Sequence, residues 1–130
     1  MNALDLASTY LSLNGAGVAT KLPGGDFMER LGHCPDDMAY LVGVYAQTQD
    51  WPHWEMHPKG HELLVMLDGR MEVTLDQDGV LTRAILEPGG GALLIPPGAW
   101  HIARVLGPGR MLGVTYGEGT QHRPLEGTSR

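Results

Sequence analysis

The chain has 130 residues, with 15 Asp and Glu against 9 Lys and Arg, and a formal net charge of −6. This acidic balance argues against a nucleic-acid-binding protein, which normally presents a basic face. The longest apolar runs are too short to cross a bilayer, the first ten residues lack the pattern of a signal peptide, and the single cysteine excludes an intrachain disulfide. We therefore expect one soluble cytoplasmic domain over residues 1–130, with no nucleic-acid or membrane partner.

Helix signals are sparse, and strand signals dominate. Asn2–Ala7 and Asp26–Leu31 are each expected to form a turn or two of helix. In the second segment, Asp26 and Glu29 have the spacing of a capping box. The expected strands, each bounded by turn residues, are Thr9–Leu13, Val18–Leu22, Ala39–Thr48, Trp51–His57, Glu62–Leu67, Arg70–Leu75, Leu81–Leu86, Ala92–Ile95, His101–Val105 and Met111–Tyr116. About ten short strands with almost no helix predict an all-β sandwich or barrel.

The stretch Trp51–Gly69, WPHWEMHPKGHELLVMLDG, is rich in imidazole and carboxylate groups. His53, Glu55 and His57 fall on one face of the expected strand, because side chains alternate along a strand. A Pro-Lys-Gly turn follows, and the chain returns with Glu62 on the next strand. Neighbouring strands bring such side chains within about 5 Å of one another.

A second stretch, Gly89–His101, is expected to lie opposite the first. Its Pro-Pro-Gly turn directly precedes the strand that begins with His101, so one more imidazole can join the group. Imidazole and carboxylate together form a ligand set that suits Zn, Fe, Mn or Ni. The two stretches therefore predict a metal site or a small-ligand pocket.

These stretches resemble the paired motifs of the cupin superfamily, which are small β-barrels of the jelly-roll type. The first motif has the pattern G-x5-H-x-H-x3-4-E-x6-G, and its last four marked positions are taken by Glu55, His57, Glu62 and Gly69. The second motif, G-x5-P-x-G-x2-H-x3-N, is matched by Gly90, Pro96, Gly98 and His101. The resemblance implies a single-domain, RmlC-like cupin jelly roll with its barrel core at about residues 39–116 and a polar tail over residues 117–130.

Three positions depart from the cupin motifs. Gln49 replaces the opening Gly, Glu55 replaces the first His, and Val105 replaces the final Asn. The metal ligands implied by the resemblance are His57, His101, Glu62 and Glu55, and the ion would be divalent Zn, Fe, Mn or Ni. Glu55 is either a ligand or a base, and Glu55 and Glu62 are the candidate catalytic carboxylates because two facing carboxyls do not both ionise readily.

Further residues are candidates for the pocket wall or for the barrel exterior. The pocket candidates are His53, Trp100, Tyr45 and Met66, with core packing as the alternative for Trp and Met. Trp54 is expected to pack outside the barrel, and His61 is expected on the surface. In the tail, Arg123 next to His122 is a candidate for binding an anionic substrate if the tail folds over the barrel mouth. The alternative is a solvated tail.

Two classes of function remain open. The resemblance implies a metal-dependent enzyme acting on a small polar molecule by isomerisation, decarboxylation or dioxygenation. The alternative is a non-catalytic small-ligand-binding cupin, with or without metal. Polar groups at all four expected ligand positions favour the enzyme. The resemblance also implies a homodimer, with the strand Thr9–Leu13 as a candidate to cross to the partner.

Overall fold

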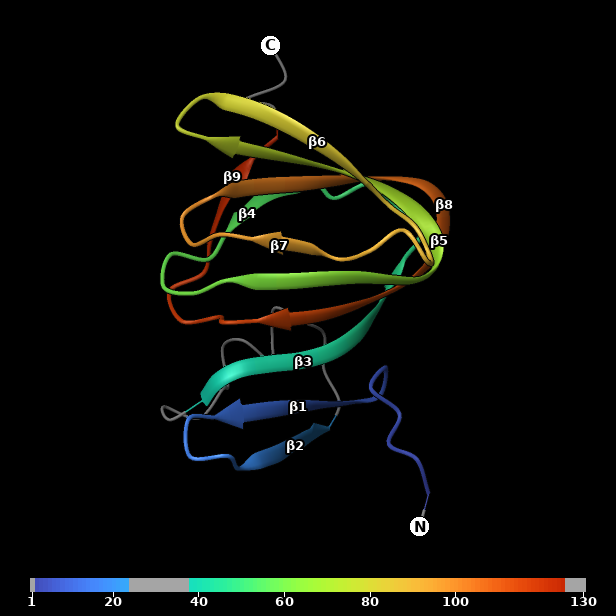
Figure 1. Cartoon of the computed structure of the whole chain (residues 1–130), viewed down its shortest axis with the longest axis vertical. Coiled ribbons are helices and arrows are strands. Elements are labelled where there is room, and N and C mark those ends of the chain that lie inside the picture. The colour runs from blue at the N-terminus through green and yellow to red at the C-terminus, as the bar shows by residue number, and fades with distance from the viewer. Residues whose placement is uncertain (1, 24–37, 126–130) are drawn as a thin grey trace.

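The structure is a computed structural model that describes residues 2–23 and 38–125. Within these ranges every regular element is a strand (Figure 1). The strands are β1 (Thr9–Asn14), β2 (Ala19–Pro23), β3 (Met38–Gln47), β4 (His53–Met56), β5 (Glu62–Gln77), β6 (Val80–Leu86), β7 (Leu93–Ile95), β8 (Trp100–Thr115) and β9 (Gln121–Pro124). The prediction of an all-β fold is confirmed. In the described ranges there is no helix long and apolar enough to cross a bilayer.

The expected N-terminal helical turn at Asn2–Ala7 is wrong. Asp5 instead heads a short hydrogen-bonded turn, in which its Oδ1 accepts from Ala7 N at 3.0 Å and its carbonyl accepts from Thr9 N at 2.9 Å. The segment cannot continue as a helix because Leu6 O accepts from Val44 N of β3 at 3.0 Å, which ties it to the sheet. The second expected helical turn, Asp26–Leu31, lies outside the described residues.

Two long strands replace four expected short ones. Residues 62–67 and 70–75 are two halves of β5, and residues 101–105 and 111–115 are two halves of β8. The turn signals at Gly69 and Gly109 bend the strands instead of ending them, because these glycines face each other where the pairing of β5 with β8 shifts register. Asp68 closes the bend by accepting from Arg110 N at 2.6 Å, Nε at 3.0 Å and Nη2 at 2.8 Å.

The sheet curls back on itself as a half-barrel around the β5–β8 pair (Figure 1). This pair runs antiparallel from Glu62 opposite Thr115 to Asp76 opposite Trp100. The strand order is β2-β1-β3-β8-β4-β9, while β5 also pairs with β6 and β7. The candidate crossing strand, β1, pairs with β2 and β3 of its own chain.

The core fills the inside of the curl. In each half of β5, on either side of the bend, every second side chain is buried, and in the second half these are Met71, Val73 and Leu75. The core also includes Leu64, Met66, Leu86, Ile95, Ala99, Ala103 and Met111. The same alternation turns Glu62 and His101 inward, so the strands that build the core also present the candidate ligands.

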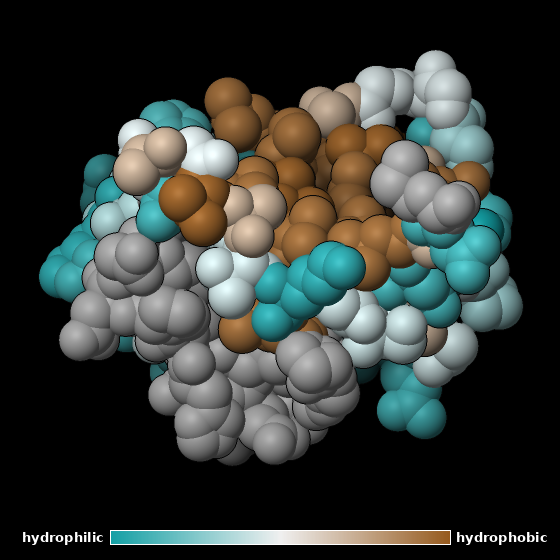
Figure 2. All heavy atoms as spheres, turned by 90° about the horizontal axis from the view of Figure 1, so that it is seen from below, coloured by the Kyte–Doolittle hydropathy of each residue, from teal (hydrophilic) through white to brown (hydrophobic). Residues whose placement is uncertain are grey.

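Some outward side chains on the same strands are also apolar. Strand register places five of them in one continuous row across β1, β3, β8, β5 and β7, here called the apolar outer row: Leu11, Val42, Val114, Leu63 and Leu94. A view from the β2 side shows apolar side chains gathered over a broad area (Figure 2). Polar residues normally occupy the solvent face of an antiparallel sheet, so this pattern is typical of a covered face.

The beginning of the C-terminal tail is a strand. β9 pairs antiparallel with β4, with Glu55 opposite His122 and Trp54 opposite Arg123. Residues 121–124 of the tail therefore extend the sheet, although three of these four residues are exposed to solvent.

Candidate metal centre

Four side chains from three strands and one turn converge inside the barrel. Glu55 lies on β4, His57 directly follows β4, Glu62 begins β5, and His101 is the second residue of β8. Register explains the meeting, because Glu55 lies opposite His101 and Glu62 lies opposite Thr115. All four are buried, and one potential ligand atom from each lies within 4.8 Å of the others. The structure thus brings together the four residues predicted as ligands.

Glu62 is the centre of this cluster. Its Oε2 lies 3.2 Å from His57 Nε2, and its Oε1 lies 3.0 Å from His101 Nε2. Thr115 Oγ1 donates a hydrogen bond of 2.5 Å to Oε2, which fixes the carboxylate. Glu55 approaches from the other side, with its Oε1 3.0 Å from His57 Nε2.

The outer nitrogens of both imidazoles are tied to acceptors. Thr120 Oγ1 donates to Gly117 O at 2.8 Å, so at its 2.8 Å contact with His57 Nδ1 the hydroxyl accepts. His101 Nδ1 lies 3.1 Å from Ala99 O, a carbonyl that only accepts. Each ring therefore carries a proton on Nδ1 and turns Nε2 towards the carboxylates, which is the arrangement of a metal-binding imidazole.

The electrostatics of the cluster favour a positive charge at its centre. Burial alone would lower the pKa of His57, but the adjacent carboxylates of Glu55 and Glu62 outweigh it and raise this pKa to about 9. Burial would raise the pKa of Glu62, yet the close contacts with His101 and His57, chiefly hydrogen bonds, hold it well below its usual range. Without another cation, the cluster keeps a proton on His57.

The donor set fits a divalent metal. Four buried atoms of the cluster have no hydrogen-bond partner outside it among the described residues: Glu55 Oε1, His57 Nε2, Glu62 Oε1 and His101 Nε2. Metal–ligand distances of 2.0–2.2 Å place opposite ligands about 4.2 Å apart, close to the observed span of 4.8 Å. Two nitrogens and two carboxylate oxygens suit Zn, Fe, Mn or Ni.

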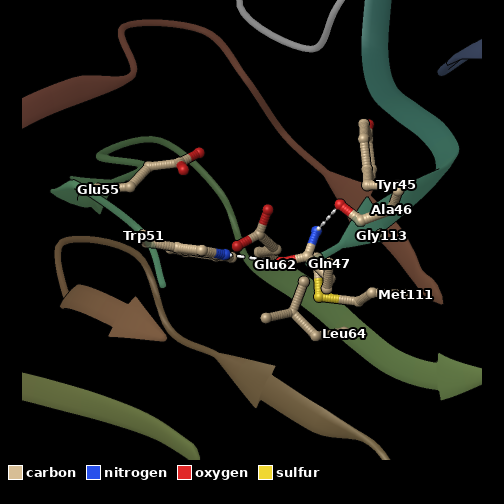
Figure 3. A pocket seen from close by; sticks show the side chains of 9 residues that line it. All are labelled: Tyr45, Ala46, Gln47, Trp51, Glu55, Glu62, Leu64, Met111 and Gly113. Carbon is tan, nitrogen blue, oxygen red and sulfur yellow. Dashed lines mark hydrogen bonds between the residues drawn. The ribbon is translucent and has the colours of Figure 1, made fainter. Parts of the chain in front are cut away.

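A cavity of about 260 Å³ opens beside the cluster (Figure 3). Its lining residues are Tyr45, Ala46, Gln47, Trp51, Glu55, Glu62, Leu64, Met111 and Gly113. The two carboxylates form a polar end, and most of the remaining wall is apolar. Gln47 is fixed in the wall, because Trp51 Nε1 donates to its Oε1 at 2.7 Å and its Nε2 donates to Ala46 O at 3.1 Å (Figure 3).

The other predicted pocket residues occupy different places. Tyr45 lines the cavity, whereas Met66 is buried in the apolar core. His53 is exposed, with its ring 6.4 Å from that of His122, and Trp100 packs against Arg123. These three do not line the cavity described above. His61 is exposed, as predicted.

Several site residues were not found from the sequence. Thr115 shares the inward alternation of Met111 on β8, so counting forward by two residues at a time from Met111 would have identified it. Gln47 at the end of a strand and Trp51 in the following loop are joined by a side-chain hydrogen bond. No local sequence pattern predicts this bond. Thr120 lies in a turn of the polar tail, and the sequence carries no signal for its contact with His57.

Arg123, a candidate for binding an anionic substrate, is already engaged. Its guanidinium carbon lies 4.8 Å from the ring centroids of both Trp54 and Trp100, and its Nη2 donates to Asp76 Oδ2 at 2.8 Å. The Asp76 pKa is lowered, chiefly by this hydrogen bond. Trp54, expected to pack outside the barrel, is buried beneath this guanidinium.

Comparison with known proteins places the fold. No family model and no curated protein matches the chain. Among solved structures, a variant of oxalate decarboxylase from Bacillus subtilis is similar with a TM-score of 0.55 and 15% identity, over 68% of this chain and 24% of that chain. Hydroxypropylphosphonic acid epoxidase from S. wedmorenis is similar with a TM-score of 0.51 and 16% identity, over 61% of this chain and 44% of that chain.

A third similar structure is the Fe(II) form of the epoxidase with its substrate, with a TM-score of 0.51 and 17% identity, over 61% of this chain and 47% of that chain. The chain thus spans less than half the length of each of these neighbours. Both proteins have the cupin fold, so the prediction of a cupin jelly-roll β-barrel is confirmed. At such low identity the likeness shows the fold alone.

Proposed function

We propose that Glu55, His57, Glu62 and His101 hold a divalent transition metal, and that the chain is a small metal-dependent cupin enzyme. The observation that carries this is the pair of buried imidazoles whose Nδ1 atoms are tied and whose Nε2 atoms face two carboxylates beside an open cavity. Zn, Fe, Mn and Ni all suit the donor set. The epoxidase of similar fold has an Fe(II) form and a Co(II) form.

The two carboxylates have different roles in this proposal. A bound metal would supply Lewis acidity for a substrate oxygen. Glu62 holds the ligand position, because Thr115 and both imidazoles fix its oxygens. Glu55 also faces the cavity, and its Oε1 contacts only His57 within the cluster, so of the two carboxylate ligands Glu55 is the one that also moves a proton on or off the substrate. Isomerisation and decarboxylation each include such a proton transfer.

The cavity favours a small substrate with one polar end. Its volume is about 260 Å³, below the roughly 300–1,000 Å³ of pockets for drug-sized ligands. Among the described residues that line it, none carries a positive charge. The apolar wall formed by Leu64 and Met111 also supports the alternative, a non-catalytic ligand-binding barrel. Turnover of a bound ligand by the metal-loaded protein distinguishes the two.

The metal centre is tested by elemental analysis. We expect untagged wild-type protein to contain close to one equivalent of Fe, Mn, Ni or Zn per chain, and the double variant His57→Ala, His101→Ala to contain none, because half of the ligand atoms are removed. His61→Ala is the matched control, since His61 is exposed and lies in the same stretch. A wild-type protein that stays metal-free after reconstitution with each ion would overturn the proposal.

We also propose that the apolar outer row is the contact surface of a homodimer. Its members are half-buried or exposed and adjoin one another across five strands. Burying such a row against a second copy removes apolar surface from water at about 25 cal/mol per Å². The row lies on the outer face, so the dimer would leave the cavity inside each barrel.

The double variant Val114→Lys, Leu94→Lys is expected to be monomeric. Two ammonium groups in the centre and at the end of the row would have to be desolvated on association. Light scattering coupled to size exclusion gives the mass. Val80→Lys is the control, because Val80 is 65% exposed and lies on β6, outside the row. A monomeric wild type, or a dimer that survives the double substitution, would refute this surface.

A further inference from the structure

We infer that Thr120 is a positioning residue of the metal centre, held in place by a C-terminal arm, here residues 117–124. The inference rests on the proposed metal-binding function. The arm follows β8 and returns along β4, so it reaches the cluster from outside the barrel core. Thr120 does not contact the site of the metal itself. It acts on the opposite nitrogen of one ligand.

The direction of the hydrogen bond at Thr120 is fixed by its own turn. Thr120 N and Oγ1 both donate to Gly117 O, at 3.2 Å and 2.8 Å. The single hydroxyl proton is therefore used, and Oγ1 presents a lone pair to His57 Nδ1 at 2.8 Å. An acceptor at Nδ1 fixes the ring with Nε2 inward and makes that nitrogen a better donor to a metal.

His57 needs this support because it stands outside the regular part of β4. The strand ends at Met56, and Pro58 follows His57 directly. The carbonyl of His57 accepts a hydrogen bond from Gly98 N at 3.0 Å. This bond holds the backbone of His57 but leaves its ring free to rotate. The Thr120 contact is the hydrogen bond that orients the ring from the side away from the carboxylates.

The arm is anchored beside two ligands. β9 pairs with β4, and Arg123 places its guanidinium against Trp54 and Trp100, 4.8 Å from each ring centroid. Trp54 precedes Glu55, and Trp100 precedes His101. Asp76 at the end of β5 accepts from the same guanidinium at 2.8 Å. The Arg123 guanidinium thus stacks on two tryptophan rings and pairs with one carboxylate, and these contacts bind the arm to β4, β8 and β5.

The test compares Thr120→Val with Thr120→Ser. Valine has the shape of threonine without the acceptor, whereas serine keeps the hydroxyl. Co²⁺ affinity is measured by competition with a chelator. We expect it to fall roughly 10–100-fold in Thr120→Val, which is the usual effect of removing the hydrogen-bond partner of a metal-binding imidazole. In Thr120→Ser it is expected to stay at the wild-type value. Thr82→Val is the control, because Thr82 is exposed on β6.

A second readout needs no metal. The His57 Nδ1 proton should appear in the NMR spectrum of the metal-free protein as a slowly exchanging ring N–H, present in wild type and Thr120→Ser and lost in Thr120→Val. If Thr120→Val fails to fold, Arg123→Lys replaces it. That change keeps a positive charge for Asp76 but removes the planar stack, so it is expected to weaken Co²⁺ binding while the protein stays folded.

The outcomes separate the two proposals. A wild type that binds no metal removes the proposed function, and the slowly exchanging ring proton still decides the role of Thr120. A wild type that binds Co²⁺, with equal affinity and an unchanged ring proton in Thr120→Val, overturns the inference about Thr120. If Thr120→Val does not fold, unchanged Co²⁺ affinity and an unchanged ring proton in Arg123→Lys overturn it.

Discussion

Glu62→Gln is expected to abolish metal binding and to destabilise the metal-free protein by about 3 kcal/mol, the lower end of the range for breaking a buried ion pair. Glu62 is 4% exposed and contacts His57, His101 and Thr115 at once. An amide of the same shape has one oxygen instead of two. It cannot accept from Thr115 and also face two imidazole nitrogens, so at least one buried group loses its partner.

The measurements for Glu62→Gln are metal content and urea unfolding of the chelator-treated protein. Glu87→Gln is the matched control, because the Glu87 carboxylate pairs with Arg70 at 3.1 Å but is half exposed, and exposed pairs contribute little. Glu62→Gln protein that keeps its metal would show that Glu62 is not a ligand. Unchanged stability of the metal-free form would show that the ion pairs of the cluster do not support the fold.

Gly109→Ala is expected to destabilise the protein by about 3 kcal/mol, the upper end of the usual cost of overpacking. A Cβ at this position would lie 2.1 Å from Asp68 O and 2.4 Å from Asp68 C. These are backbone atoms of the paired strand and cannot rotate away. The bend of β5 against β8 would have to open, which would also strain the Asp68–Arg110 contacts.

Thermal and urea unfolding measure this effect. Gly15→Ala is the control substitution, because a Cβ at Gly15 would meet nothing within 4 Å. The control is expected to keep the wild-type midpoint. If Gly109→Ala unfolds at the same urea concentration as Gly15→Ala, then the two long strands do not approach as closely as described at their bend.

The cluster of candidate ligands could be predicted from the sequence, because two-residue alternation and motif spacing specify which side chains share a face. The meeting of Glu55 and His57, two residues apart at the end of β4, with Glu62 on the next strand follows from this rule. The same rule did not predict that β5 and β8 are each one continuous strand. A Gly after Asp68 has the same local signature whether the chain reverses or bends, and only the matching glycines on the partner strand decide between the two.

The C-terminal arm was beyond sequence reasoning for a related reason. Its polar composition is typical of a solvated tail, and a lone Arg gives no indication of its partners. Arg123 finds two tryptophans from different strands and one aspartate from a third. Such a site depends on pairing between segments far apart in the chain, so local propensity carries no information on it. The prediction of an N-terminal helical turn was wrong for the same reason, because Leu6 O accepts a hydrogen bond from Val44 N of the distant strand β3.

The long antiparallel pair of β5 and β8 also determines when the site can form. Glu62 and Thr115 are 53 positions apart in the sequence, so their strands must close a large loop before the cluster exists. Chains dominated by such distant pairings fold slowly, because loop entropy is lost before contacts compensate for it. Metal capture would therefore follow strand pairing. A bound ion would slow unfolding and raise the population of folded chains, but it would not speed the search that builds the barrel.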